Sequence, residues 1–116
     1  MASFSKELLS GCTDGRGIKL TSTTGAGSGT TIHTAHASAT DEVWVYMVNS
    51  SASSVKVTCE HGGTTDPDDH IELTIQAEDG LVQVIPGLPL TNSLVLTAFA
   101  SVADVVACYG YVNRIT

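Results

Sequence analysis

The stretch DEVWVYMVN, residues 41–49, carries apolar side chains at nearly every position. Successive side chains of an extended strand point to opposite faces, so Val43 and Met47 lie on one side, and Trp44 and Tyr46 on the other. Because both sides are apolar, we expect this strand to be central in a sheet or half-covered by a partner. Two interpretations of Trp44 and Tyr46 stay open: they form a contact between subunits, or they fill the second side of a two-sided core.

The rest of the chain continues this strand-like pattern. Apolar and polar residues alternate with a period of two, and Val, Ile and Thr are frequent, which is typical of β-strands. Seven further strands are predicted, at residues 17–24, 30–36, 54–61, 70–76, 81–86, 94–100 and 103–115. Short strands at regular spacing, separated by polar turns, predict an all-β fold: a single-domain β-sandwich or jelly-roll-like barrel of about eight strands.

The N-terminal segment differs from the rest. Residues 1–16 lack a core pattern and are predicted to form an N-terminal arm before a β-sandwich domain at residues 17–116. The arm either crosses a neighbouring subunit or is a disordered tail. Within it, residues 3–11 form a helix of a turn or two, or an extended segment. In the domain, Pro86 is expected to end its strand or mark a sheet edge, and Gly110 to mark a bulge or a close backbone approach.

Size and charge narrow the possible functions. A chain of 116 residues favours one domain with a core of its own. The chain has five Lys and Arg residues and 12 Asp and Glu residues, which gives a formal net charge of -7. Because this charge repels phosphate backbones, no direct nucleic-acid partner is expected. The sequence contains neither an apolar run long enough to cross a membrane nor a secretory signal pattern. We therefore expect no membrane partner, and folding in the cytoplasm of the producing cell.

Cysteine usage agrees with an intracellular origin. Cys12, Cys59 and Cys108 are odd in number and widely spaced, without the clustering of a zinc site. Cys59 and Cys108 lie in apolar, strand-like stretches and are predicted to be buried free thiols, because free cysteine packs as a small hydrophobic residue. No cofactor is predicted.

The stretch HGGTTDPDDH, His61–His70, is the part of the sequence that most resembles an active site. Counted from Asp66, its spacing does not fit an EF-hand calcium loop. An irregular calcium site of Asp66, Asp68 and Asp69 and a zinc site that uses both terminal histidines are the metal-binding alternatives. A polar connection between two strands explains every residue, since Gly-Gly and Asp-Pro steps favour turns, and it is the interpretation we favour. The three aspartates are then a candidate salt-sensitive contact with a basic neighbour.

Other constellations do not predict catalysis. His33 and His36 are three apart, so on a regular strand they face opposite sides and cannot share a metal ion. Cys59 and His61 can share a face, which is a weak protease-like pattern, but Cys59 belongs to the apolar side of its strand. No GxSxG motif is present, and no pair of carboxylates stands out. No catalytic residue is predicted, and we expect the protein not to be an enzyme.

Several stretches of the sequence resemble small virion proteins of tailed bacteriophages, namely head decoration (cement) proteins and related head and tail accessory proteins. The similarity covers the chain from about Glu7 to Thr116, and its most distinctive parts are GYVNRI at 110–115 and DGRGIK at 14–19. The quoted stretches are ELLSGCTDGRGIKL (7–20), TIHTAHASATDEVWVYMVN (31–49), EHGGTTDPDDHIELTI (60–75), LVQVIPGLPL (81–90) and LPLTNSLVLTAFASVADVVACYGYVNRIT (88–116).

The resemblance implies a structural protein of the virion, located on the capsid surface. Such proteins are compact and β-rich, are often homotrimers, and bind the major capsid protein to stabilise the assembled head without catalysis. Arg114 is expected to pair with a carboxylate, either closing the barrel or bridging subunits. The candidate contact residues are Trp44, Tyr46, Asp66, Asp68, Asp69, Arg16 and Arg114.

Three alternatives remain. A phage tail or head–tail accessory protein has the same sequence features. A β-sandwich carbohydrate-binding module is expected to display exposed aromatic residues, whereas Phe, Trp and Tyr make up only 5% of this chain. A metal-dependent enzyme comes last, because it depends on the segment at residues 61–70 binding an ion.

Overall fold

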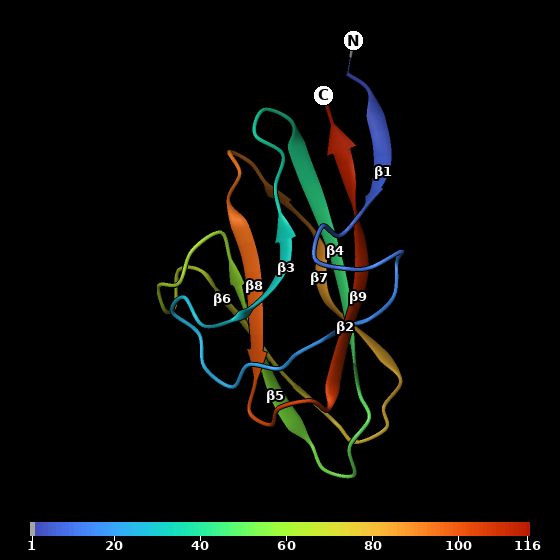
Figure 1. The fold of residues 1–116 in the computed structure, drawn as a ribbon, viewed down its shortest axis with the longest axis vertical. Helices are drawn as coiled ribbons and strands as arrows, with labels where there is room; N and C mark the ends of the chain where they lie inside the picture. Colours follow the sequence, from blue (N-terminus) through green and yellow to red (C-terminus); the bar gives the residue numbers. More distant parts are fainter. Residues whose placement is uncertain (1) are drawn as a thin grey trace.

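A computed structural model describes residues 2–116, and all of their regular secondary structure is β-strand (Figure 1). This confirms the predicted all-β fold. Across the described residues no helix has the length and apolar character needed to span a membrane. The nine strands are β1 (Phe4–Leu8), β2 (Ile18–Lys19), β3 (Thr30–Thr34), β4 (Thr40–Asn49), β5 (Val55–His61), β6 (His70–Ile75), β7 (Leu81–Leu90), β8 (Val95–Ala100) and β9 (Val106–Ile115).

The strands form two antiparallel sheets that pack as a β-sandwich (Figure 1). The β4 sheet has the order β1-β9-β4-β7, with the short β2 also paired to β9. The β5 sheet has the order β3-β8-β5-β6. Strand β4 lies between β9 and β7, which confirms that DEVWVYMVN forms a central strand.

The hydrophobic core lies between the two sheets. From β4 it receives Val43, Val45 and Met47, all without solvent exposure. From β5 it receives Val57 and Cys59, which are equally buried. Each fully buried aliphatic side chain of this size stabilises the fold by about 1.5–3 kcal/mol, so these alternating residues hold the sheets together.

Trp44 and Tyr46 lie on the outer side of the β4 sheet, half-buried, and face away from the core. The interpretation that they fill the second side of a two-sided core is therefore wrong. The outer side of β4 is apolar because it forms part of an aromatic surface, which is described below.

The N-terminal segment is extended, so the helical alternative for residues 3–11 is wrong. Strand β1 pairs along the outer edge of β9, which brings the two ends of the chain together at one end of the sandwich (Figure 1). The backbones of Ser3 and Thr116 exchange two hydrogen bonds, of 3.0 and 2.9 Å. Just after β1, Leu9 is buried in the core.

Several predicted strands differ in length from those of the structure, and two of the differences concern the course of the chain. The strand expected at 17–24 contains only Ile18 and Lys19, because the chain then leaves the sheet and crosses the outer side of the β5 sheet. The strand expected at 81–86 continues to Leu90. Pro86 does not end this strand, but β7 lies at the edge of its sheet, as the proline predicts. The pairing of β7 with β4 is irregular at two places along the strand.

Candidate functional site

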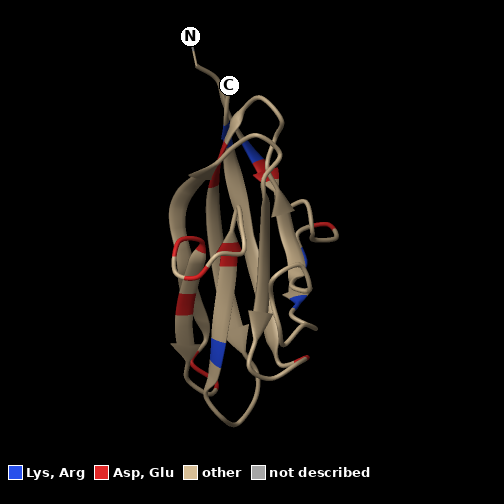
Figure 2. Ribbon diagram, turned by 90° about the vertical axis from the view of Figure 1, so that its left-hand side faces the viewer, with Lys and Arg blue, Asp and Glu red and all other residues tan. Residues whose placement is uncertain are grey.

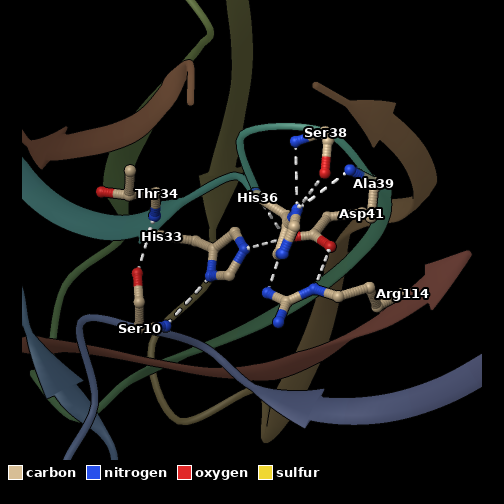
Figure 3. A network of polar contacts seen from close by, with 8 residues as sticks. All are labelled: Ser10, His33, Thr34, His36, Ser38, Ala39, Asp41 and Arg114. Atoms are coloured by element: carbon tan, nitrogen blue, oxygen red, sulfur yellow. Dashed lines mark hydrogen bonds and ion pairs between the residues drawn. The ribbon is translucent and has the colours of Figure 1, made fainter. Parts of the chain in front are cut away.

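A buried polar network joins the two sheets near the chain termini (Figure 3). Its centre is Asp41 of β4, which has no solvent exposure. Arg114 of β9 binds the Asp41 carboxylate through two nitrogens, with Nε–Oδ1 2.8 Å and Nη2–Oδ2 3.1 Å. His33 of β3 reaches the same carboxylate from the other sheet, with Nε2–Oδ2 2.7 Å. The backbone amide of His36 adds a bond of 3.2 Å to Asp41 Oδ2.

The hydrogen bonds fix the protonation of His33. Its Nδ1 accepts the backbone N–H of Ser10 at 3.0 Å, so the proton lies on Nε2, which donates to Asp41. Neither ring nitrogen has a free lone pair with which to remove a proton from a substrate. The Ser10 hydroxyl oxygen accepts the Thr34 amide at 2.7 Å, and no hydrogen bond joins it to the imidazole (Figure 3). Despite containing Ser, His and Asp, the arrangement therefore lacks the geometry of a catalytic triad.

The network stabilises the ionised form of Asp41. Burial alone raises the pKa of this carboxyl group, but hydrogen bonds from Arg114, His33 and the His36 amide outweigh burial and lower the pKa to about 2. The prediction that Arg114 pairs with a carboxylate is confirmed, and the partner belongs to the same chain. An additional role of Arg114 between subunits stays a prediction.

A second feature is an aromatic surface on the outer side of the β4 sheet. Pairing places Trp44 opposite Tyr111 and Tyr46 opposite Tyr109 on β4 and β9, and Phe4 of β1 lies on the same side. This surface, called the aromatic face from here on, holds five of the chain's six Trp, Tyr and Phe residues. Phe4 is 72% exposed, and Tyr109 38%.

The aromatic face is held in place by specific contacts. The rings of Trp44 and Tyr111 stack at a centroid distance of 6.2 Å and an interplanar angle of 11°. Glu42 accepts the indole N–H of Trp44 at 2.8 Å and the side-chain amide of Asn113 at 3.1 Å. The Lys6 ammonium lies 4.6 Å from the centre of the Tyr111 ring. A face with fixed aromatic orientations loses little side-chain entropy on binding a partner.

Glycine makes room for Trp44 on two sides. Gly87 of β7 has a left-handed φ of 82°, and a Cβ there would lie 2.7 Å from Cζ2 of the Trp44 ring. Gly110 of β9 faces the Trp44 carbonyl so closely that no Cβ fits. The expected close backbone approach at Gly110 is confirmed.

The segment at residues 61–70 connects β5 to β6, which confirms the polar connection. The Asp69 carboxylate accepts the Thr65 amide at 3.0 Å, and the Asp69 carbonyl accepts the His61 amide at 2.8 Å, so Asp69 closes the loop. Asp66 and Asp68 are exposed. Within the described part of the chain, the carboxylates of Asp66, Asp68 and Asp69 do not gather within 4.8 Å of one another, so the common calcium site is not formed.

The two histidines of this segment point in different directions. His61 bonds through Nε2 to the Pro89 carbonyl of β7 at 3.2 Å. His70 lies on the outer side of the β5 sheet, where it pairs with Glu60. The proposed zinc site of His61 and His70 is therefore wrong. Within residues 2–116, one group of three ligand side chains lies within 4.8 Å of one another: Asp66, His70 and Glu72.

The remaining candidates lie apart. Arg16 is exposed in the loop after β1, at a cavity of about 760 Å³ that Lys19 and Cys12 also line. Cys59 and Cys108 are buried free thiols, as predicted. Burial raises the pKa of Cys59 to about 12, so this thiol stays protonated at neutral pH and the protease-like pattern has no nucleophile.

Comparisons with protein-family models, with curated proteins and with solved structures found no match for this chain. The structure assigns candidate residues that the sequence argument did not single out: Tyr109 and Tyr111 of the aromatic face, Asp41 of the network, and Glu60 and Glu72 beside His70. The spacing of YGY at 109–111 was a signal for the first two, because it puts both tyrosines on one side of a strand.

Proposed function

We propose that this protein is a capsid decoration protein: a structural protein that binds the assembled phage head and stabilises it by contact, without catalysis. The sequence stretches that resemble virion proteins give the class. The aromatic face is the observation that carries the proposal, because it offers a large, rigid and partly apolar surface on a small acidic domain.

Exposed apolar side chains enlarge this face at its rim. Leu8 of β1 lies opposite Tyr111 and is 56% exposed, and Leu81 of β7 lies opposite Val48 and is 57% exposed. Large apolar patches on soluble proteins mark interaction surfaces. Tyrosine and tryptophan are also the residues that contribute most to protein–protein binding energy when a partner covers them.

Homotrimerisation fits the same proposal. A trimer presents three copies of each contact surface, and simultaneous binding to several capsid subunits raises the overall affinity far above that of one contact. The exposed aspartates Asp66 and Asp68 on the β5–β6 connection offer an acidic contact for a basic neighbour, whereas the aromatic face offers the apolar contact.

The test uses purified protein mixed with expanded phage heads that lack a decoration protein. The proposal predicts co-sedimentation at a fixed ratio to the major capsid protein and a higher melting temperature of the heads. Binding to isolated tails without binding to heads would support a tail accessory protein instead. Truncation of the aromatic face should reduce binding to the heads at all salt concentrations. Neutralising Asp66 and Asp68 should reduce only the part of head binding that depends on salt.

A carbohydrate-binding module is the second candidate, and the Trp44–Tyr111 pair favours it. The two rings lie nearly parallel on the surface, at an interplanar angle of 11°. A parallel aromatic pair can stack against the flat side of a sugar ring, and the fixed Glu42 beside it can accept hydroxyl hydrogen bonds. Glycan binding that is lost in Tyr111→Ala, without binding to phage heads, would decide for this candidate.

A further inference from the structure

On the opposite face of the sandwich, a histidine lies between carboxylates that it does not hydrogen-bond. Strand pairing aligns His70 with Glu60 and Glu72 with Thr58, so these side chains share the outer side of the β5 sheet. Asp66 approaches from the β5–β6 connection, four residues before His70. The side chains of Asp66, His70 and Glu72 border a pocket of about 270 Å³, which is open to solvent.

The distances around His70 are too long for hydrogen bonds and suit an ion. His70 Nδ1 lies 3.5 Å from Asp66 Oδ1, and Nε2 lies 3.5 Å from Glu60 Oε2. A hydrogen bond between such atoms is expected at about 2.7–3.0 Å. Two ligands of one tetrahedral Zn²⁺, each about 2.1 Å from the metal, are about 3.4 Å apart, close to the separation of His70 Nδ1 and Asp66 Oδ1.

Glu60 is the carboxylate that faces the other ring nitrogen of His70. This carboxylate is 1% exposed and accepts the Ala26 amide and the Thr97 hydroxyl, each at 3.0 Å. His70 Nε2 is buried and has no hydrogen-bond partner among the described residues, and Glu60 Oε2 is the acceptor in front of it. An acceptor at that position favours the tautomer with the proton on Nε2. The Nδ1 lone pair then points towards Asp66, and two electron-rich atoms face each other.

A cation between these atoms completes an arrangement common in metalloproteins. Metal-ligating histidines usually donate their second ring N–H to a carboxylate, which orients the ring and increases the basicity of the ligand atom. We propose that Asp66, His70 and Glu72 bind one divalent transition-metal ion of the Zn²⁺ class, with Glu60 as the orienting carboxylate behind His70. One imidazole and two carboxylates leave the remaining position to water. The site is separate from the aromatic face, and of the proposed acidic contact with the capsid it includes only Asp66.

Lys56 is the competitor for this site. Its ammonium lies 2.6 Å from Glu72 Oε2, and both side chains are about half exposed. Exposed pairs of this kind are weak, so an ion can displace the ammonium. Removal of Lys56 should therefore strengthen metal binding, an effect that a purely structural cluster would not produce.

The test is Zn²⁺ titration of the full chain by calorimetry, in a Cys12→Ser background that removes the partly exposed thiol. One ion per chain is expected, with affinity at least about tenfold weaker in His70→Asn and Asp66→Asn. Asp68→Asn is the matched control: it removes the same charge from the same loop and should bind within about twofold of the parent. Lys56→Ala should bind about two- to fivefold tighter.

Three results would overturn the proposal. The first is no heat and no rise in melting temperature at millimolar Zn²⁺. The second is unchanged affinity in His70→Asn, whose fold is checked by its melting curve without metal. The third is equal affinity for Mg²⁺, which would show that no imidazole binds the ion. If His70→Asn does not fold, the Lys56→Ala and Asp66→Asn pair decides, because they should shift the affinity in opposite directions.

Discussion

The two outer faces of the sandwich are built from the same kind of strand and carry different chemistry. On the β4 sheet, neighbouring outward positions of β4 and β9 carry Trp44, Tyr46, Tyr109 and Tyr111, and the Trp44 and Tyr111 rings stack. On the β5 sheet, the outward positions of β5 and β6 include Lys56, Glu60, His70 and Glu72, and the loop that follows β2 covers part of them. Figure 2 shows the acidic residues spread over several elements, with few basic ones among them.

The difference suits the two faces to two different kinds of interaction, both of them proposed above. Aromatic rings bind a partner by excluding water over a wide area, which needs a rigid and nearly uncharged surface. Carboxylates and imidazole bind an ion or a charged group, which needs few atoms in precise positions. The substitutions below alter the outer face of the β4 sheet, the outer face of the β5 sheet, or the network between the sheets.

The largest effect is expected from breaking the network that joins the sheets. Asp41→Ala leaves Arg114 and His33 without their buried partner, and removal of one member of a buried ion pair typically costs about 3–5 kcal/mol. Urea unfolding, followed by the fluorescence of the single tryptophan, measures the change. Asp68→Ala is the exposed control and should stay within about 0.5 kcal/mol of the parent. A similar effect of both changes would show that the network does not hold the sheets together.

Acid should weaken the same network in the intact protein. Because the pKa of Asp41 is lowered from 3.8 to about 2, its contribution is complete above pH 4 and is lost as pH falls towards 2. At 1.36 kcal/mol per pH unit this contribution is about 2 kcal/mol. Unfolding free energies measured between pH 5 and pH 2 should fall by this amount more in the parent than in Asp41→Asn. Parallel curves would contradict the account.

A smaller change should disturb the aromatic face alone. Gly87→Ala places a Cβ against the Trp44 ring at a left-handed φ, so we expect a destabilisation of about 1–2 kcal/mol and a shifted tryptophan emission. Gly80→Ala is the matched control, because its φ of 78° is similar and nothing lies within 4 Å of the added atom. Only Gly87→Ala should change the emission, and a change in both would mean that the effect does not come from the Trp44 contact.

The smallest effect is expected on the outer face of the β5 sheet. Lys56→Ala removes a half-exposed ion pair with Glu72, which contributes little because solvent screens it. Its unfolding free energy without added metal should change by less than about 1 kcal/mol. A larger loss in urea unfolding would show that this cluster is structural.

Much of the fold could be predicted from alternation in the sequence. The central strand at residues 41–49 and the edge strand with Pro86 follow from local patterns, because side-chain direction and proline's missing N–H act within one strand. The strand at residues 17–24 was predicted too long. Leu20 still bonds through its backbone to Val106 and Asp104, but the Ser22 carbonyl accepts the amide of Ala100 in the other sheet, and contacts so distant in sequence leave no local signal.

The candidate sites were less predictable for the same reason. The alternation in β4 puts Trp44 and Tyr46 on one side of the strand, but only pairing with β9 places Tyr109 and Tyr111 beside them. The segment at 61–70 contains Asp66 and His70, yet the other two carboxylates of the proposed ion site come from the strands on either side. That segment alone offers only His61 as a second histidine for a zinc site and does not reveal these two carboxylates.

The central claim is that the aromatic face makes the functional contact with the phage head. Two aromatic truncations on opposite faces test it directly: Tyr46→Ala on the β4 sheet and Phe99→Ala on the β5 sheet, both at half-buried positions. Co-sedimentation with heads, at a temperature where both variants are folded, should show at least about tenfold weaker binding for Tyr46→Ala and nearly unchanged binding for Phe99→Ala. Equal binding of the two variants, or a greater loss in Phe99→Ala, would contradict the claim.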